Sequence, residues 1–253
     1  MANDVVVVIP ARLASTRLPG KVLRVLAGKP MVQHVWERAC ASEVGEVFIA
    51  TDDAEVARTA VAFGAKVEMT APDHASGTDR IAEVVAARDW PAQTVVVNVQ
   101  GDEPLIPPAN IRQVAQNLSA RPNMQMATLT EPLSETDLSD PGAVKVAVNV
   151  HGQALYFSRA TIPWYRDAFA TNAGLLPATT LLRRHIGIYA YRANYLAEFV
   201  ALGPCALEQA EALEQLRALY HGAAIHVADA LEAPGPGVDT EADFRRVEAL
   251  LRA

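Results

Sequence analysis

A loop rich in cationic and hydroxyl side chains follows the first apolar run of the sequence. Residues 10–21 read PARLASTRLPGK and include Arg12, Ser15 and Lys21. Arginine and lysine form charge-assisted hydrogen bonds with phosphate oxygens, loop amides add further donors, and Gly20 allows the backbone to approach a bound anion. This composition favours a polyphosphate site. Because the loop matches neither GxxxxGK[ST] nor GxGxxG, an ordinary solvated loop is the alternative interpretation.

Two aspartates are candidate metal ligands. Asp102 stands in the segment NVQGDEP, directly after an apolar run, and Asp239 follows the segment PGPGV. A hard carboxylate can hold Mg²⁺, which keeps several waters and bridges substrate phosphates instead of entering an all-protein cage. The local sequence equally suits Asp239 as the N-cap of a helix. Our prediction is that Asp102 and Asp239 pair at a Mg²⁺ site.

Other kinds of catalytic centre lack their motifs. The histidines form no HExxH or Cys/His cluster, and no GxSxG segment supports covalent catalysis. Cys40 and Cys205 are the only cysteines and lie outside any CxxC motif, which predicts a reduced, cytoplasmic protein without a disulfide framework or zinc site. The groups that remain favour direct displacement at phosphorus.

Alternating apolar and helical segments must position these groups. The run from Val5 to Ile9 is continuously β-branched, as expected of a parallel strand buried on both faces. Similar short runs recur between amphipathic segments. This alternation predicts right-handed crossovers and an α/β fold with a doubly wound, mostly parallel sheet that binds ligands at the carboxyl ends of its strands. The predicted strands are 5–9, 47–50, 66–69 and 95–99, and the predicted helices are 30–41, 54–63 and 79–88.

The pattern changes after about residue 140. Residues 144–148 alternate, and a turn at His151 and Gly152 leads to a second strand at 154–157, which predicts a hairpin. Further predicted elements are a strand at 186–191, a helix at 207–220, a strand at 225–228 and a helix at 241–251. We predict one domain over residues 1–253, with a core at about 1–140 and 222–253 and an inserted mixed region at about 141–221.

The overall charge argues against a polymer partner. The chain has 22 basic and 29 acidic residues, a formal net charge of −7, so it offers no broad cationic surface to a nucleic-acid backbone. A few local arginines and lysines can still form a positive pocket for an acidic small molecule. The run at 5–9 is too short for a membrane span or a signal sequence. We expect no nucleic-acid partner, no membrane partner and no export.

The chain resembles the 3-deoxy-manno-octulosonate cytidylyltransferase family, also called CMP-Kdo synthetases, along essentially its whole length. Beside the segments already quoted, the resemblance rests on HASGTDR at 74–80, LYFSRATIPW at 155–164, RHIGIY at 184–189 and LEQLR at 213–217. It implies a Rossmann-like nucleotidyltransferase that transfers CMP from CTP to the acidic sugar Kdo for lipopolysaccharide biosynthesis. It also implies a homodimer built partly through the inserted region, which would bind the sugar. One position departs from the family pattern, because Tyr165 stands where an acidic residue is expected.

The resemblance further implies roles for individual residues. The implied nucleotide-binding set is Ala11, Arg12, Ser15, Lys21, Ser76 and Arg80. The implied sugar-binding set is Gln100, Arg159, His185, Tyr189 and Glu214. Arginine and histidine can meet the Kdo carboxylate, while the other three can bond its hydroxyls. The implied ligands of Mg²⁺ are Asp102 and Asp239, and the implied catalytic residues are Lys21, Arg12 and Asp102.

Three alternatives stay open from sequence alone. The same chemistry could act on 8-amino-Kdo or sialic acid, because few pocket contacts distinguish one sugar substituent. A non-catalytic nucleotide-sensing module would keep the phosphate loop without turnover, although the presence of both Asp102 and Asp239 speaks against it. A nicotinamide dehydrogenase is disfavoured because its GxGxxG motif is missing.

Overall fold

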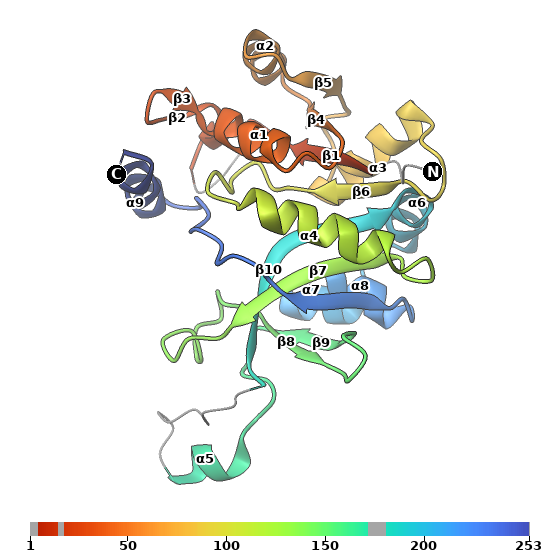
Figure 1. Ribbon diagram of the computed structural model, residues 1–253, viewed down its shortest axis with the longest axis vertical. Coiled ribbons are helices and arrows are strands. Elements are labelled where there is room, and N and C mark those ends of the chain that lie inside the picture. The colour runs from red at the N-terminus through yellow and green to blue at the C-terminus, as the bar shows by residue number, and fades with distance from the viewer. Residues whose placement is uncertain (1–4, 15–17, 172–180, 253) are drawn as a thin grey trace.

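The parallel half of the sheet contains the predicted N-terminal strands. The computed structural model describes residues 5–14, 18–171 and 181–252. These residues form a nine-stranded sheet with helices on both faces (Figure 1), and its main path runs β11-β7-β10-β6-β1-β4-β5. The four strands predicted in this half are confirmed, and neighbours among them pair in parallel. They are β1 (Val5–Pro10), β4 (Glu46–Thr51), β5 (Lys66–Met69) and β6 (Val95–Asn98).

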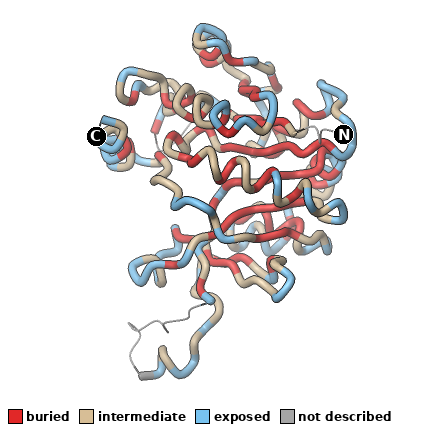
Figure 2. The backbone as a smooth tube through the Cα atoms, in the orientation of Figure 1, coloured by how far each residue is buried: buried red, intermediate tan, exposed pale blue. Residues whose placement is uncertain are grey.

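Strand β1 contributes side chains to a core on each face of the sheet. Val7 and Ile9 belong to one buried cluster, and Val6 and Val8 belong to the other. Figure 2 shows the strands as the buried centre of the molecule. Helices cover both faces and remove both sets of side chains from water, which explains why this strand is continuously apolar.

Capping residues decide where the covering helices begin. Asp53 caps α2, because its Oδ1 accepts hydrogen bonds from the amides of Glu55 at 2.8 Å and Val56 at 3.0 Å. Ser76 caps α3 through a reciprocal capping box with Asp79, so this helix begins two residues before its predicted start. Helices α1 (Met31–Ala41), α2 (Ala54–Ala62) and α4 (Pro108–Ser119) contribute to one core, and α3 (Gly77–Arg88) and α6 (Ala193–Leu202) contribute to the other.

The other half of the sheet is mixed. Strand β10 (Arg183–Arg192) lies antiparallel between β6 and β7 (Met126–Pro132), and β11 (Ile225–Asp229) pairs in parallel with β7. The predicted hairpin is confirmed as β8 (Lys145–Val148) and β9 (Ala154–Ser158), and β8 also pairs with β10. Because β10 pairs with the last residue of β6, the start of β10 extends past the carboxyl end of β6.

The prediction of one helix at 207–220 is wrong. The structure has two short helices, α7 (Ala206–Glu211) and α8 (Gln215–Tyr220), separated at Ala212, whose φ is 49°. A residue in the left-handed conformation cannot continue a right-handed helix. The resulting change of direction brings Leu213 into the core and turns Glu214 toward α3.

Helix α9 (Glu241–Arg252) docks on a small hairpin that follows the first loop. This hairpin consists of β2 (Val25–Leu26) and β3 (Lys29–Pro30), and a 3₁₀ turn at Lys21–Leu23 precedes it. The Arg24 guanidinium lies over the Phe244 ring, 3.9 Å from its centroid, and forms an ion pair with Glu241. These contacts hold the start of α9 beside the loop after β1.

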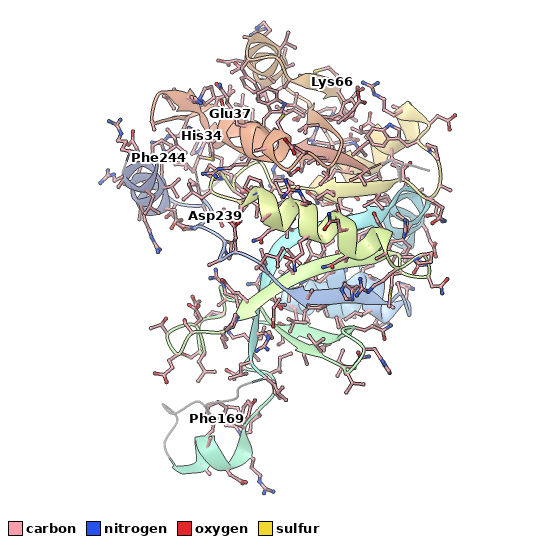
Figure 3. The ribbon with its side chains drawn as sticks, in the orientation of Figure 1. His34, Glu37, Lys66, Phe169, Asp239 and Phe244 are labelled. Carbon is pink, nitrogen blue, oxygen red and sulfur yellow. The ribbon has the colours of Figure 1, made fainter. Side chains whose placement is uncertain are left out.

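A separate segment projects away from the sheet. It carries α5 (Arg166–Thr171), which lies far from the strands in Figure 1. Phe169, labelled in Figure 3, packs against Trp164 with ring centroids 4.4 Å apart. Within the described ranges, none of the helices combines the length and apolarity that a membrane crossing requires.

Candidate active site

A polar cavity of about 230 Å³, here called the site cavity, opens beyond the carboxyl ends of β1 and β6. The loops after these two strands, the start of α3 and the segment before α9 form its walls. The first two loops pack closely because Gly101 has no side chain, and a Cβ there would lie 2.8 Å from the carbonyl oxygen of Pro10. Figure 3 shows Asp239 between α9 and the sheet. The sequence-predicted residues that line the site cavity are Arg12, Lys21, Ser76, Arg80, Gln100, Asp102 and Asp239.

Lys21 lies between the two aspartates. Its Nζ is 2.5 Å from Asp102 Oδ2 and 3.2 Å from Asp239 Oδ1. It also donates to the carbonyl oxygen of Val238 at 3.3 Å. Burial alone lowers the pKa of Lys21, but the Asp102 and Asp239 carboxylates outweigh burial and raise this pKa above its ordinary value. Lys21 therefore carries a full positive charge at neutral pH.

The backbone brings both aspartates within reach of one cation. The Val238 amide donates to the carbonyl oxygen of Asp102 at 2.9 Å and so joins the loop after β6 to the segment before α9. At the start of α9 the Asp243 amide donates to Thr240 Oγ1 at 3.2 Å, and the Thr240 amide donates to Asp243 Oδ2 at 2.9 Å. Thr240 thus fills the N-cap role that the local sequence also allowed for Asp239.

The donor set formed by the two aspartates suits a hard divalent cation. Carboxylate oxygens from Asp102 and Asp239 already converge on one positive group, the ammonium of Lys21. In the described part of the chain, no cluster of three His, Cys, Asp or Glu side chains is arranged to hold a metal ion. Two carboxylates completed by phosphate oxygens and water are the surroundings that Mg²⁺ takes in nucleotide enzymes, so the residues present fit this ion.

The predicted phosphate contacts have different surroundings. Arg12 is exposed and lines the site cavity, so its charge is available to a ligand there. The Ala11 amide donates to the carbonyl oxygen of Ala50 at 2.8 Å and therefore serves the sheet. Ser15 lies outside the described residues. Arg12 and Lys21 consequently supply two positive charges to one cavity.

Protein contacts hold both Ser76 and Arg80. Ser76 Oγ accepts from the Asp79 amide at 3.1 Å and donates to Glu214 Oε1 at 3.0 Å. The Arg80 side chain is only 3% exposed, and its guanidinium lies 3.4 Å from Asp52 Oδ1. These two residues therefore form a fixed wall of the site cavity.

His185 and Tyr189 lie together on β10. Their ring centroids are 5.3 Å apart, the Phe157 ring meets His185 edge-on at 5.0 Å, and His185 Nε2 lies 3.0 Å from Thr128 Oγ1. Burial, helped by the charge of Arg184, lowers the pKa of His185 to about 3. Burial also raises the pKa of Tyr189 well above its ordinary value. Both side chains are thus uncharged at neutral pH, and His185 offers a neutral hydrogen-bonding ring instead of a cation.

Gln100 lines the site cavity, and Glu214 contacts its wall. Gln100 Nε2 donates to Asn98 Oδ1 at 2.9 Å. Glu214 contacts the cavity wall through Ser76, and its Oε2 accepts from Thr78 Oγ1 at 2.9 Å. Burial raises the pKa of Glu214 despite these two hydroxyl donors. The structure therefore joins a predicted sugar-side residue to the predicted nucleotide-side helix.

Arg159 is occupied by backbone carbonyl groups. Its guanidinium donates to the carbonyl oxygens of Glu211 at 2.6 Å, Pro141 at 2.8 Å and Ala212 at 3.2 Å. These bonds tie the loop before β8 to the break between α7 and α8. Arg159 thereby fixes the segment that carries Glu214.

Sequence reasoning missed two groups near the site. His74 lines the site cavity and forms a hydrogen bond with Glu83. Glu103 lies close to the Gly237 backbone, where a Cβ would be 2.8 Å from Glu103 Oε1. Burial and the charge of Asp102 raise the pKa of Glu103 to about 8. The available signals were the place of His74 in HASGTDR and the position of Glu103 directly after Asp102.

A Rossmann-like sheet with a cationic loop and an aspartate pair at its carboxyl edge defines the nucleotidyltransferase class, and residues 6–225 match the cytidylyltransferase family. Curated relatives named 3-deoxy-manno-octulosonate cytidylyltransferase include proteins of Pseudomonas syringae pv. syringae (strain B728a) and Pseudomonas fluorescens (strain Pf-5). The first is 59% identical over 97% of both chains, and the second is 57% identical over 100% of both. The chain belongs to the 3-deoxy-manno-octulosonate cytidylyltransferase family.

Solved structures agree with this placement. One of CMP:2-keto-3-deoxy-manno-octonic acid synthetase complexed with CTP is 43% identical and covers 98% of both chains with a TM-score of 0.90. A cytidylyltransferase from Leptospira borgpetersenii serovar Hardjo-bovis (strain JB197) is 14% identical, covers 98% of this chain and 87% of its own, and has a TM-score of 0.64. The second likeness concerns the fold alone. The predicted fold class and enzyme class are thus confirmed.

Proposed function

We propose that this enzyme transfers CMP from CTP to 3-deoxy-D-manno-octulosonate (Kdo) and releases pyrophosphate. The observation that carries the proposal is the position of Lys21 between Asp102 and Asp239 in the site cavity. The structural relative complexed with CTP supports CTP as the nucleotide substrate. The names of the relatives that are 57% and 59% identical support Kdo as the sugar substrate.

In this reaction the 2-hydroxyl oxygen of Kdo forms a bond to the α-phosphorus of CTP. The bond from that phosphorus to the oxygen of the leaving pyrophosphate breaks, and the hydroxyl proton is released. Phosphoryl-type transfer requires mainly positioning and stabilisation of negative charge. Arg12 and Lys21 supply two positive charges for this purpose at the site cavity. No covalent intermediate with the protein is required.

Mg²⁺ is the proposed cofactor, held by Asp102 and Asp239. Support comes from the two carboxylates that already meet one cationic group and from the preference of Mg²⁺ for carboxylate, phosphate and water oxygens. When bound, Mg²⁺ would polarise the α-phosphate and lower the pKa of the attacking hydroxyl. Lys21 keeps the two carboxylates compensated in the absence of the ion.

The two substrates are assigned to two groups of residues. The proposed CTP contacts are Ala11, Arg12, Ser15, Lys21, Ser76 and Arg80. The proposed sugar contacts are Gln100, Arg159, His185, Tyr189 and Glu214. Among the sugar contacts Arg159 is the cationic side chain, because burial keeps His185 neutral. We therefore expect the Arg159 guanidinium, which also bonds three backbone carbonyls, to balance the charge of the Kdo carboxylate, and the other four side chains to bond its hydroxyls.

Pyrophosphate release tests the choice of substrates. The purified enzyme with Mg²⁺ and CTP is expected to release pyrophosphate with Kdo and not without sugar, and UTP is expected to replace CTP poorly. Release with 8-amino-Kdo or sialic acid but not with Kdo would keep the chemistry and change the sugar. No release with any of these sugars would contradict the proposal and favour a nucleotide sensor.

A homodimer through the inserted region is also proposed. Large apolar side chains are exposed there, with Leu155 on β9 61% exposed, Trp164 65% and Leu181 70%. Leu155 and Leu181 border a cavity of about 420 Å³ that Pro163 also lines. Contiguous exposed apolar surface of this kind is typical of protein interfaces. A second copy of the chain would cover it.

Introducing negative charge on this surface is expected to produce monomers. A Leu155→Glu and Leu181→Glu double variant should shift the mass measured by light scattering from about twice the chain mass of 27.1 kDa to that of one chain. Each carboxylate buried at an apolar interface costs several kcal/mol. The free energy of dimerisation of an ordinary dimer is ~8 to 12 kcal/mol, so this cost weakens the dimer enough to dissociate it at micromolar concentration. Leu250→Glu, at a position 51% exposed on α9, is the matched control and should leave the mass unchanged. A dimeric double variant would argue against this interface.

The proposed setting is the cytoplasm, where the product would serve lipopolysaccharide synthesis. Cys40 and Cys205 are both free thiols, as a reducing compartment favours. An enzyme that activates an acidic sugar with CTP requires access to the nucleotide pool of the cell. Fractionation of cells that produce the protein should place it with other cytoplasmic enzymes.

A further inference from the structure

A pair of hydroxyl groups at the start of α3 holds both oxygens of the Glu214 carboxylate. Ser76 Oγ donates to Oε1 at 3.0 Å, and Thr78 Oγ1 donates to Oε2 at 2.9 Å. Ser76 is the cap of α3 and lines the site cavity, whereas Thr78 is 2% exposed and stands behind this wall. The orientation of Glu214 is therefore set by a helix that is distant in sequence.

The start of α3 also lies against Gln100. A Cβ at Gly77, between Ser76 and Thr78, would lie 3.8 Å from Gln100 Oε1. Gln100 Nε2 donates to Asn98 Oδ1 at 2.9 Å, and Asn98 is 1% exposed. The first turn of α3 therefore lies close to both Glu214 and Gln100.

The break between α7 and α8 makes this arrangement possible. A continuous helix would carry Glu214 along its own axis, but the left-handed Ala212 directs the start of α8 toward α3. A carboxylate in such surroundings is costly unless donors satisfy its oxygens. Thr78 and Ser76 are those donors, and a fully satisfied network of this kind fixes one geometry.

We propose that Thr78 is a positioning residue for the sugar, whose hydroxyl sets the orientation of the Glu214 carboxylate. The proposal rests on the proposed function, because it takes Glu214 as a sugar contact. It assigns Thr78 no contact with either substrate. Since α3 also carries Ser76 and Arg80 on the nucleotide side, the hydrogen bonds from Ser76 and Thr78 to Glu214 connect the two substrate sides.

Replacing Thr78 with valine tests the network, because valine keeps the shape and removes the hydroxyl. The KM for Kdo is expected to rise about tenfold, the loss associated with one buried hydrogen bond, while the KM for CTP stays within about twofold. Thr78→Ser restores the hydroxyl and should restore the KM for Kdo. Thr94→Val is the matched control, because Thr94 is 2% exposed and its Oγ1 has no hydrogen-bond partner in the described ranges.

Other outcomes would overturn the proposal. An unchanged KM for Kdo in Thr78→Val, an equal rise for both substrates, or failure of the serine variant to rescue would each contradict it. If Thr78→Val does not fold, Thr78→Ala carries the test, with Thr94→Ala as its control because the buried Thr94 hydroxyl lacks a partner in the described part of the chain. An unchanged KM for Kdo in Thr78→Ala would then overturn the proposal. Failure of the proposed function is distinguishable, because the unmodified enzyme itself would release no pyrophosphate with Kdo.

Discussion

Asp102→Asn is expected to lower kcat about 100-fold or more at saturating CTP and Kdo. The change keeps the size of the side chain and removes one of two carboxylates at the proposed Mg²⁺ site, where Asp102 Oδ2 lies 2.5 Å from Lys21 Nζ. Loss of one preorganised electrostatic group in an active site has an effect of about this size. Initial rates of pyrophosphate release measure it directly.

Asp73→Asn provides the control for this charge change. Asp73 is exposed, and it adjoins His74, a lining residue of the site cavity. The Asp73→Asn change removes the same charge close to the site. It should leave kcat within about twofold, since an isolated surface charge contributes little interaction energy. Near-normal turnover in Asp102→Asn would remove Asp102 from the metal site.

Lys21→Met is expected to lower kcat by a factor of about 100 to 1,000. Methionine approximates the length of the side chain but lacks the ammonium group, so negative charge that develops on the phosphates loses a nearby cation. Asp102 and Asp239 also lose the positive group that lies between them. The measurement is again the rate of pyrophosphate release, with thermal unfolding to confirm that the variant is folded.

Lys29→Met is the matched control for Lys21→Met. Lys29 also pairs with a carboxylate, Glu37, at 2.7 Å, but its side chain is 45% exposed and it does not line the site cavity. Surface pairs contribute between 0 and about 1 kcal/mol, so this variant should retain turnover. A Lys21→Met enzyme as active as the Lys29→Met enzyme would contradict the role assigned to Lys21.

Strands buried on both faces were predictable because their pattern is local. Val5 to Ile9 could be recognised from five adjacent β-branched residues, and the structure places this run inside the sheet, between β6 and β4. The rule that ligands bind at the carboxyl ends of parallel strands then brought the loop after β1 and Asp102 to one edge. The site cavity confirms that these groups gather there.

Features that depend on tertiary contacts were not predictable in the same way. The helical spacing of leucines in 207–220 hid the break at Ala212, because an alanine in the left-handed conformation leaves no local signal. Helices α4 and α6 and strand β7 were not predicted, although Pro108 at the start of α4 is a recognised helix-start signal. The Asp53 cap led to the correct start of α2, whereas the Ser76 cap of α3 and the Pro108 signal of α4 were present in the sequence but were missed.

Charge states in the site also required the structure. His185 was interpreted as a group able to meet the Kdo carboxylate, but its burial beside Phe157 and Tyr189 makes it neutral. Likewise, the sequence indicates both aspartates but not that Lys21 stands between them. These facts depend on which side chains exclude water and on distances between residues more than 80 positions apart, as the 81-residue separation of Lys21 and Asp102 illustrates.

CMP transfer requires attack on the α-phosphorus of CTP. ³¹P NMR of the enzyme with CTP, Kdo and Mg²⁺ resolves the phosphorus products and so identifies the phosphorus that is attacked. A phosphodiester signal for CMP-Kdo is expected to grow in equal proportion with pyrophosphate while CTP declines. Formation of CDP and inorganic phosphate, or unchanged CTP in the presence of Kdo, would contradict CMP transfer.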